Sequence, residues 1–215
     1  MAGSNILSWE KFLKKPLSSY KKWFNAEKKF ILKYITKNSR VLEVGCGDGR
    51  SLKDVLKITP YIVGVDNDPI AVEHATKNFR RYPQVKILLA EGSHLPFKAN
   101  LFNCVTCIGT FTNLGKQKFK VLSEMKRVTK LKGKLIISAF SETSLPERLK
   151  VYKKISLENI AVIKKSGTVI FKDFGKNNIS EQFSEKQLRA IFKKAKLKVL
   201  EIKKVGIGYV CVLEK

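Results

Sequence analysis

The chain has 215 residues, of which 44% are hydrophobic, which is enough to bury one sizeable core. No apolar run approaches the roughly 20 residues of a membrane-spanning helix, and residues 1–15 lack the apolar stretch of a secretion signal, so we expect a cytoplasmic protein without a membrane partner. The formal net charge of +25 favours anionic partners such as RNA. Lysines occur in nearly every predicted helix, however, so solvent-exposed helix faces are an alternative explanation of this charge.

Aromatic and aliphatic residues recur at helical spacing over residues 18–36, which predicts an amphipathic helix before the first strand. The four cysteines lie in predicted strands or in the glycine loop described next. Cys104 and Cys107 form a C-x-x-C, but residues three apart in a strand point to opposite faces. We therefore predict neither a disulfide nor a metal site there, and interpret the cysteines as small buried hydrophobic residues.

From residue 41 an apolar strand runs directly into Gly45, Gly47 and Gly49, and with Glu43 the segment reads E-x-G-x-G-x-G. Glycine allows positive φ angles and lets a ligand approach main-chain N–H groups that a Cβ would shield. The spacing differs from the G-x-G-x-x-G of dinucleotide-binding loops, which argues against NAD. The segment predicts a loop that binds some other cofactor.

Acidic residues end the next two predicted strands. Asp66 follows the glycine loop by about 20 residues, where a carboxylate accepts hydrogen bonds from ribose hydroxyls. Capping the helix that begins at Pro69 is the alternative, although Asn67 or Asp68 fits that role better. Glu91 follows the third strand at the carboxyl edge of the sheet, where it can accept from an amino group such as that of adenine.

Strands and helices alternate along the rest of the chain, which predicts an α/β fold: a doubly wound, mostly parallel seven-stranded sheet closed by an antiparallel C-terminal hairpin. A capping box at Ser184 and Gln187 predicts the helix before that hairpin. Residues 144–180 break the alternation with a lysine-rich helix and an extended piece at 168–174. We expect one domain made of an N-terminal helical cap (1–38), a cofactor-binding core (39–143), a small insert over the pocket (144–180), and a helix with the closing hairpin (181–215).

The order of these motifs resembles the class I, Rossmann-like S-adenosylmethionine-dependent methyltransferases over most of residues 18–215. VLEVGCGDGR is similar to the motif that holds the methionine end of the cofactor, and VGVDNDPIAVEHA to the motif that places Asp66 on the ribose. AEGSHLPF and LFNCVTCIGTFTNL resemble the next two motifs, in which Glu91 and the N–H of Gly92 would read adenine. The sequence departs from the family pattern at Asn67, at Glu91 and at Asn103, where an apolar residue and two aspartates are usual.

The resemblance implies S-adenosyl-L-methionine as cofactor, with S-adenosyl-L-homocysteine as product. The implied cofactor-binding residues lie in the glycine loop, at the strand ends and on the N-terminal helix: Glu43, Gly45, Cys46, Gly47, Gly49, Asp66, Asn67, Glu91, Gly92, Ser93, Ile108, Tyr20 and Trp23. For Tyr20 and Trp23, packing in the core is an equal alternative. His94 is interpreted as a surface turn residue rather than a base.

Similarity to the family also places Thr110, Thr112 and Asn113 at the methyl-acceptor site, with a simple strand-to-helix loop as the alternative. The sequence therefore predicts methyl transfer to an N or O atom of a small molecule. A tRNA or rRNA methyltransferase that uses the basic surface is one alternative, and a non-catalytic cofactor-binding module is another. The N/D-P-P-Y/F signature of base amino methylation is absent, which favours a small molecule or a protein side chain, of which we place the small molecule first.

Overall fold

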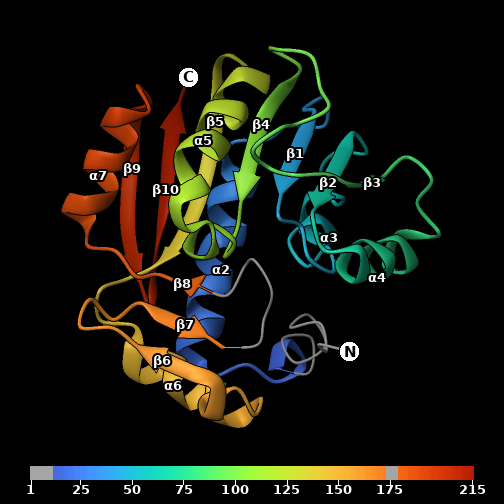
Figure 1. Cartoon of the computed structure of the whole chain (residues 1–215). Helices are drawn as coiled ribbons and strands as arrows, with labels where there is room; N and C mark the ends of the chain where they lie inside the picture. Colours follow the sequence, from blue (N-terminus) through green and yellow to red (C-terminus); the bar gives the residue numbers. More distant parts are fainter. Residues whose placement is uncertain (1–11, 173–178) are drawn as a thin grey trace.

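The computed structural model describes residues 12–172 and 179–215 (Figure 1). The first part of the predicted helical cap, residues 1–11, and the last two residues of the predicted extended piece, 173–174, lie outside the described residues. Within the described ranges, no helix is both long and apolar enough to cross a bilayer.

A central seven-stranded sheet has the order β3-β2-β1-β4-β5-β10-β9. Its strands are β1 (Val41–Val44), β2 (Ile62–Asp66), β3 (Lys86–Leu89), β4 (Phe102–Cys107), β5 (Thr129–Phe140), β9 (Lys198–Val205) and β10 (Gly208–Glu214). β10 is antiparallel to both of its neighbours, whereas the strands from β3 to β5 are parallel. The predicted doubly wound sheet with an antiparallel C-terminal hairpin is confirmed.

Helices cover both faces of this sheet (Figure 1). They are α2 (Ser18–Lys33), α3 (Leu52–Val55), α4 (Pro69–Phe79), α5 (Lys118–Val128) and α7 (Glu185–Lys194), with the 3-10 turns η1 (Phe111–Asn113) and η2 (Gly115–Gln117) before α5. One hydrophobic core joins the sheet to α2, α3 and the end of α4, and the other joins it to α5 and α7. Cys104 belongs to the first core and Cys107 to the second, as expected for opposite faces of one strand.

Local signals set two helix starts. Asp68 caps α4, because its carboxylate accepts a hydrogen bond from the Ile70 amide at 2.9 Å. At α7, Ser184 and Gln187 form the predicted capping box. The helix predicted after the glycine loop is only the single turn α3.

The segment after β5 forms a separate layer beyond the carboxyl ends of the parallel strands (Figure 1). The predicted helix there is α6 (Leu145–Lys154), followed by η3 (Glu158–Ile160) and a small antiparallel sheet of β6 (Ala161–Ile163), β7 (Val169–Phe171) and β8 (Ile179–Ser180). The sequence did not predict this sheet, because strands of two or three residues are too short to show a period of two. Tyr152, Leu157, Val169 and Phe171 give this layer its own core.

Helix α2 is held against the last strand by Trp23, which is 2% exposed. The indole Nε1 donates to the Tyr209 carbonyl at 3.3 Å, and its ring lies 5.2 Å from that of Phe140. Gly208 makes room for the indole, since a Cβ on this residue would stand 2.3 Å from Trp23 Cε2. The position of α2 over the sheet thus depends on a glycine in β10.

We predict that Gly208→Ala lowers the free energy of unfolding by about 1–3 kcal/mol, because the added methyl group overfills the contact with the indole. For a chain of this size that corresponds to a fall in Tm of roughly 2–4 °C per kcal/mol, measured by thermal denaturation. Lys203→Ala, at an exposed position of the neighbouring strand, is the control. Equal Tm values for the two variants would contradict this account of how α2 is seated.

Candidate functional site

Two adjoining cavities lie at the carboxyl ends of β1, β2 and β4. The larger, of about 190 Å³, contains these predicted residues: Tyr20, Trp23, Glu43, Gly45, Cys46, Gly47, Ile108, Thr110, Thr112 and Asn113. The smaller, of about 90 Å³, contains Gly45, Asp66, Asn67, Glu91, Gly92, Ser93, Thr110 and Asn113. Gly49 lines neither cavity, and a Cβ there would meet the Phe79 ring at 2.3 Å. The glycine loop thus borders both spaces.

The glycine loop is fixed by β2. Gly45 and Gly47 have φ angles of 73° and 54°, which favour glycine. The amides of Gly45 and Cys46 donate to the Val65 carbonyl at 2.8 and 3.0 Å. The Gly47 amide donates to Asp66 Oδ2 at 2.8 Å. The loop is therefore already shaped by its own hydrogen bonds, and its main chain faces the cavity.

Asp66 stands at the end of β2 and is held by two backbone donors, the Gly47 amide and the Asp68 amide, the latter at 3.0 Å from Oδ1. Burial raises the pKa of this carboxyl, while the two amides pull it down. The alternative role of helix cap belongs to Asp68 instead. Asp66 is therefore a rigidly placed acceptor on the wall of the smaller cavity.

Asn67 and Glu91 meet across the smaller cavity. Asn67 Nδ2 donates toward the two Glu91 carboxylate oxygens at 3.4 and 3.3 Å. This contact gives a reason for both departures from the family pattern at these positions, since a polar residue and a longer acid reach each other here. The pair presents an amide and a carboxylate to any ligand in that space.

Thr110 separates the two cavities. Its hydroxyl donates to the Gly45 carbonyl at 2.9 Å, and a Cβ on Gly45 would stand 2.3 Å from Thr110 Cγ2. Thr112, in η1, donates to the Gly109 carbonyl at 3.0 Å. This segment is thus a strand-to-helix turn and a cavity wall at once, so the two interpretations of it do not exclude each other.

Sequence analysis missed an ion pair beneath the larger cavity. Glu27 in α2 is 1% exposed, and its Oε2 lies 2.8 Å from Arg50 Nη2. The Ser138 hydroxyl donates to Glu27 Oε1 at 2.6 Å and accepts from the Gly109 amide at 2.7 Å. The Arg50 guanidinium also lies 4.1 Å from the Phe24 ring. Among the described lining residues, Arg50 is the one cation, so it is the group able to bind a carboxylate.

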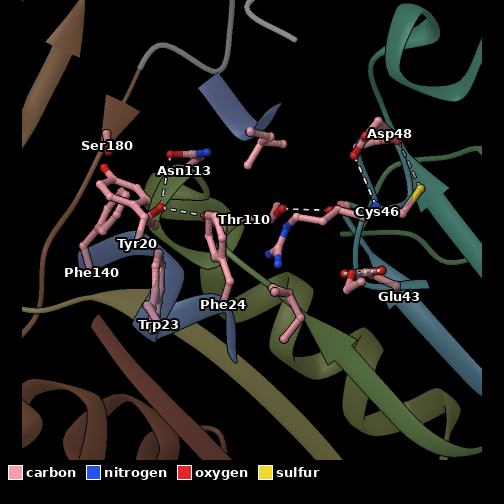
Figure 2. A pocket seen from close by; sticks show the side chains of 18 of the residues that line it. Tyr20, Trp23, Phe24, Glu43, Cys46, Asp48, Thr110, Asn113, Phe140 and Ser180 are labelled. Atoms are coloured by element: carbon pink, nitrogen blue, oxygen red, sulfur yellow. Dashed lines mark hydrogen bonds between the residues drawn. The ribbon is translucent and has the colours of Figure 1, made fainter. Parts of the chain in front are cut away.

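Aromatic side chains form the opposite wall of the larger cavity (Figure 2). Tyr20, Trp23 and Phe24 come from α2, and Phe140 from the end of β5. Tyr152 and Phe171 of the insert complete the wall, and their contribution was not predicted from the sequence. Tyr20 and Trp23 therefore both pack in the core and line the cavity. Such a wall suits a planar ligand.

Glu43 is buried at the base of the glycine loop, where both of its oxygens lie within hydrogen-bond distance of the Ser51 hydroxyl, one of them at 2.6 Å. Burial raises the pKa of Glu43 to about 8, against the lowering effect of the Ser51 hydrogen bond and the Arg50 charge. The carboxyl is therefore mostly protonated at neutral pH.

The pKa of Glu43 predicts how stability depends on pH. Between its ordinary value of 4.5 and about 8, the folded chain holds a proton that the unfolded chain releases. The free energy of unfolding therefore falls as pH rises through this window, by at most about 1.4 kcal/mol per pH unit from this group. Glu43→Gln should flatten the dependence of the free energy of unfolding on pH, and the variant should gain stability relative to the wild type toward about pH 8. Urea unfolding measures this dependence, and Glu73→Gln on the exposed face of α4 is the control. Parallel curves for wild type and Glu43→Gln would contradict the assignment.

Residues 42–137 match a family model described as a methyltransferase domain. Demethylmenaquinone methyltransferase from Renibacterium salmoninarum is 30% identical over 124 residues, which cover 58% of this chain and 51% of that protein. The mitochondrial ubiquinone biosynthesis O-methyltransferase from Schizosaccharomyces pombe is 27% identical over 154 residues, covering 69% of this chain and 54% of that protein. The chain thus spans about half the length of these curated relatives.

The fold is similar to solved methyltransferases. A 1,6-didemethyltoxoflavin-N1-methyltransferase from Burkholderia thailandensis, with bound S-adenosylhomocysteine, superposes with a TM-score of 0.70 at 14% identity. The superposition covers 98% of this chain and 87% of that one. The domain match, the relatives and the seven-stranded sheet with its glycine loop agree. Residues 42–137 of this chain therefore match a methyltransferase domain, and the fold is similar to that of the Rossmann-like S-adenosylmethionine-dependent methyltransferases.

Proposed function

We propose that the protein transfers a methyl group from S-adenosylmethionine to an N or O atom of a small-molecule acceptor. The observation that carries this proposal is the larger cavity, in which the glycine loop and the aromatic wall line the same space. A cofactor lying across the glycine loop would present its sulfonium to a molecule held by that wall.

The cofactor's chemistry fits the polar groups around the two cavities. The methionine end would lie on the Gly45–Gly47 main chain, with its carboxylate on Arg50. The ribose hydroxyls would donate to Asp66, and the adenine amino group to Glu91. One bound cofactor would thus extend from the larger cavity into the smaller one and lie beside Thr110.

The acceptor end favours a small molecule, because residues of α6, β7 and β8 line the cavity beside the aromatic residues of α2. The printed names of the two relatives, a demethylmenaquinone methyltransferase and a ubiquinone biosynthesis O-methyltransferase, support the same choice. A sulfonium is already activated for displacement, so the protein mainly aligns and desolvates the two reactants. No histidine is among the described residues of the larger cavity, which suits an acceptor that needs no strong base.

RNA remains a second candidate because of one feature. A groove beside Arg50 is lined by Lys14, Lys53 and Lys77, and it adjoins the larger cavity through Leu13 and Asp48. An RNA substrate would give an affinity that falls steeply with salt, in proportion to the number of phosphates contacted. Affinity for RNA that stays constant between low and high salt would remove this candidate.

For the ribose contact, we predict that Asp66→Asn weakens S-adenosylhomocysteine binding by about tenfold to a hundredfold. A hydrogen bond to a charged group contributes about 1.5–3 kcal/mol, and about 1.4 kcal/mol corresponds to a factor of ten. Isothermal titration calorimetry measures the effect. Asp54→Asn, at a half-buried position of α3 that lines neither cavity, should bind as the wild type does. Wild-type affinity in Asp66→Asn would remove this residue from the cofactor site.

For the carboxylate contact, we predict that Arg50→Gln weakens binding of S-adenosylhomocysteine about tenfold or more but leaves binding of 5′-methylthioadenosine unchanged. The second ligand shares the adenosine and lacks the carboxylate, so the pair isolates the interaction with Arg50. Competition calorimetry with both ligands gives the two affinities. An equal loss for both ligands would mean that Arg50 supports the loop rather than binding the carboxylate.

A further inference from the structure

Behind the aromatic wall lies a buried cation that the cofactor site does not use. Arg148 of α6 is 0% exposed, and its guanidinium lies 4.8 Å from the ring of Phe140, a residue of that wall. None of the ion pairs among the described residues involves Arg148. A charge taken out of water is costly unless an opposite charge or several good hydrogen bonds compensate it. Within residues 12–172 and 179–215, the hydrogen-bond partners of Arg148 are neutral groups.

Those neutral groups lead from Arg148 to the cavity. Nη1 donates to the Gly167 carbonyl and toward the Gln182 amide oxygen at 3.1 and 3.3 Å, and Nη2 donates to the Ser180 carbonyl at 2.7 Å. Nε donates to the Tyr152 hydroxyl at 3.0 Å, which therefore acts as an acceptor toward the guanidinium.

Because Tyr152 accepts from Arg148, its own proton is free to be donated, and it goes to Ser180 Oγ at 3.2 Å. Ser180 then keeps one hydroxyl proton of its own. Tyr152 and Ser180 both line the larger cavity, Ser180 being 4% exposed. The chain Arg148–Tyr152–Ser180, called the relay below, thus ends in a hydroxyl donor at the cavity wall, polarised from behind by a positive charge.

A second donor stands beside the relay. The hydroxyl of Tyr20 is buried and has no hydrogen-bond partner among the described residues. Tyr20 is 1% exposed and lines the same cavity. Burial, with a further contribution from Tyr152, holds the pKa of Tyr20 well above its usual range, so the group remains a neutral phenol with a proton to donate. Buried polar groups are nearly always satisfied, so an unsatisfied hydroxyl at a binding cavity indicates a missing ligand atom.

Resting on the proposed methyltransferase function, we propose that the acceptor is a planar hydroxy-aromatic compound, phenol-like, that binds as its oxyanion. The ring lies against the aromatic wall, and the oxyanion accepts hydrogen bonds from Ser180 and Tyr20. The buried charge of Arg148 supplies the missing counter-ion. This assignment chooses an oxygen acceptor over an amine, since a protonated amine would be repelled by Arg148 and a neutral one would gain little from it.

The transfer step then balances without a protein base. The hydroxyl loses its proton to solvent as the acceptor binds. An electron pair of the oxyanion forms the new bond to the methyl carbon, while the carbon–sulfur bond breaks and its pair stays on sulfur. The products are a neutral methyl ether and neutral S-adenosylhomocysteine. The relay stabilises the acceptor's oxyanion before transfer and binds the uncharged methyl ether more weakly.

Other ionisable groups also face this cavity. Glu43 is mostly protonated below about pH 8. Asp48 accepts from the Arg50 amide at 3.2 Å, and Arg50 is paired with Glu27. The relay variants below change none of these groups, so they separate the effect of Arg148 from that of the glycine loop.

The test uses 4-nitrophenol, whose phenolate absorbs visible light and whose neutral form does not. The protein is first saturated with S-adenosylhomocysteine, which fills the cofactor site without turnover, and calorimetry confirms that it binds. The pH titration of bound 4-nitrophenol should then show ionisation about 1–3 pH units below that of the free compound. Ser180→Ala and Tyr152→Phe, both conservative changes, should each lose most of this shift. Tyr82→Phe, at an exposed tyrosine, is the matched control and should keep it.

Two further readings complete the test. 4-Nitroaniline, similar in shape but without an ionisable hydroxyl, should bind more weakly than 4-nitrophenol. When S-adenosylmethionine replaces S-adenosylhomocysteine, the protein should convert 4-nitrophenol to 4-nitroanisole. If S-adenosylhomocysteine fails to bind, the proposed function itself is wrong. Three results with S-adenosylhomocysteine bound would overturn the oxyanion proposal and leave the methyltransferase proposal standing. They are no binding of 4-nitrophenol, binding of 4-nitrophenol with an unshifted pKa, and a pKa shift that persists in both relay variants.

Discussion

The site depends most on the ion pair between the buried Glu27 and the half-buried Arg50. A carboxylate that is 1% exposed must be compensated, and Glu27 meets Arg50 on one side and the Ser138 hydroxyl on the other. Through these contacts one interaction joins α2, the glycine loop, β5 and, through the Gly109 amide, the turn after β4. The aromatic residues of α2 are thereby fixed opposite the loop that would hold the methyl donor, which is the alignment that a displacement reaction needs.

Two arginines near the same cavity are in different electrostatic states, Arg50 in its lining and the buried Arg148 behind the aromatic wall. Arg50 is neutralised by Glu27, so its remaining donors offer directed hydrogen bonds with little net field. The partners of Arg148 in the described part of the chain are neutral, so none of them offsets its charge. The first arrangement suits a zwitterionic ligand whose carboxylate must be placed accurately, and the second suits a ligand that arrives with a whole negative charge. The net charge of +25 is thus less informative than where these two guanidinium groups lie.

Much of the framework was readable from the sequence, because period and turn chemistry are local. The glycine loop, the alternation of strands and helices, and the capping box at Ser184 all act within a few residues of themselves. The residues that sequence analysis missed act at a distance. Glu27 and Arg148 look like ordinary charges on amphipathic helices, and only the packing of other segments over them makes them buried. Their roles depend on partners 23 and 32 residues away, Arg50 and Ser180, which no local pattern connects.

The contact between Gly208 and Trp23 has a consequence for how the protein is made. β10 is inserted between β5 and β9, and its first residues provide the seat and the carbonyl that hold the indole of α2. It is also the last of the described strands to leave the ribosome. The glycine loop and the first five strands can pair before β10 is made, and the contacts of Glu27 with Arg50 and Ser138 lie within this earlier part. The seat of Trp23, one residue of the aromatic wall, is completed only when β10 joins the sheet.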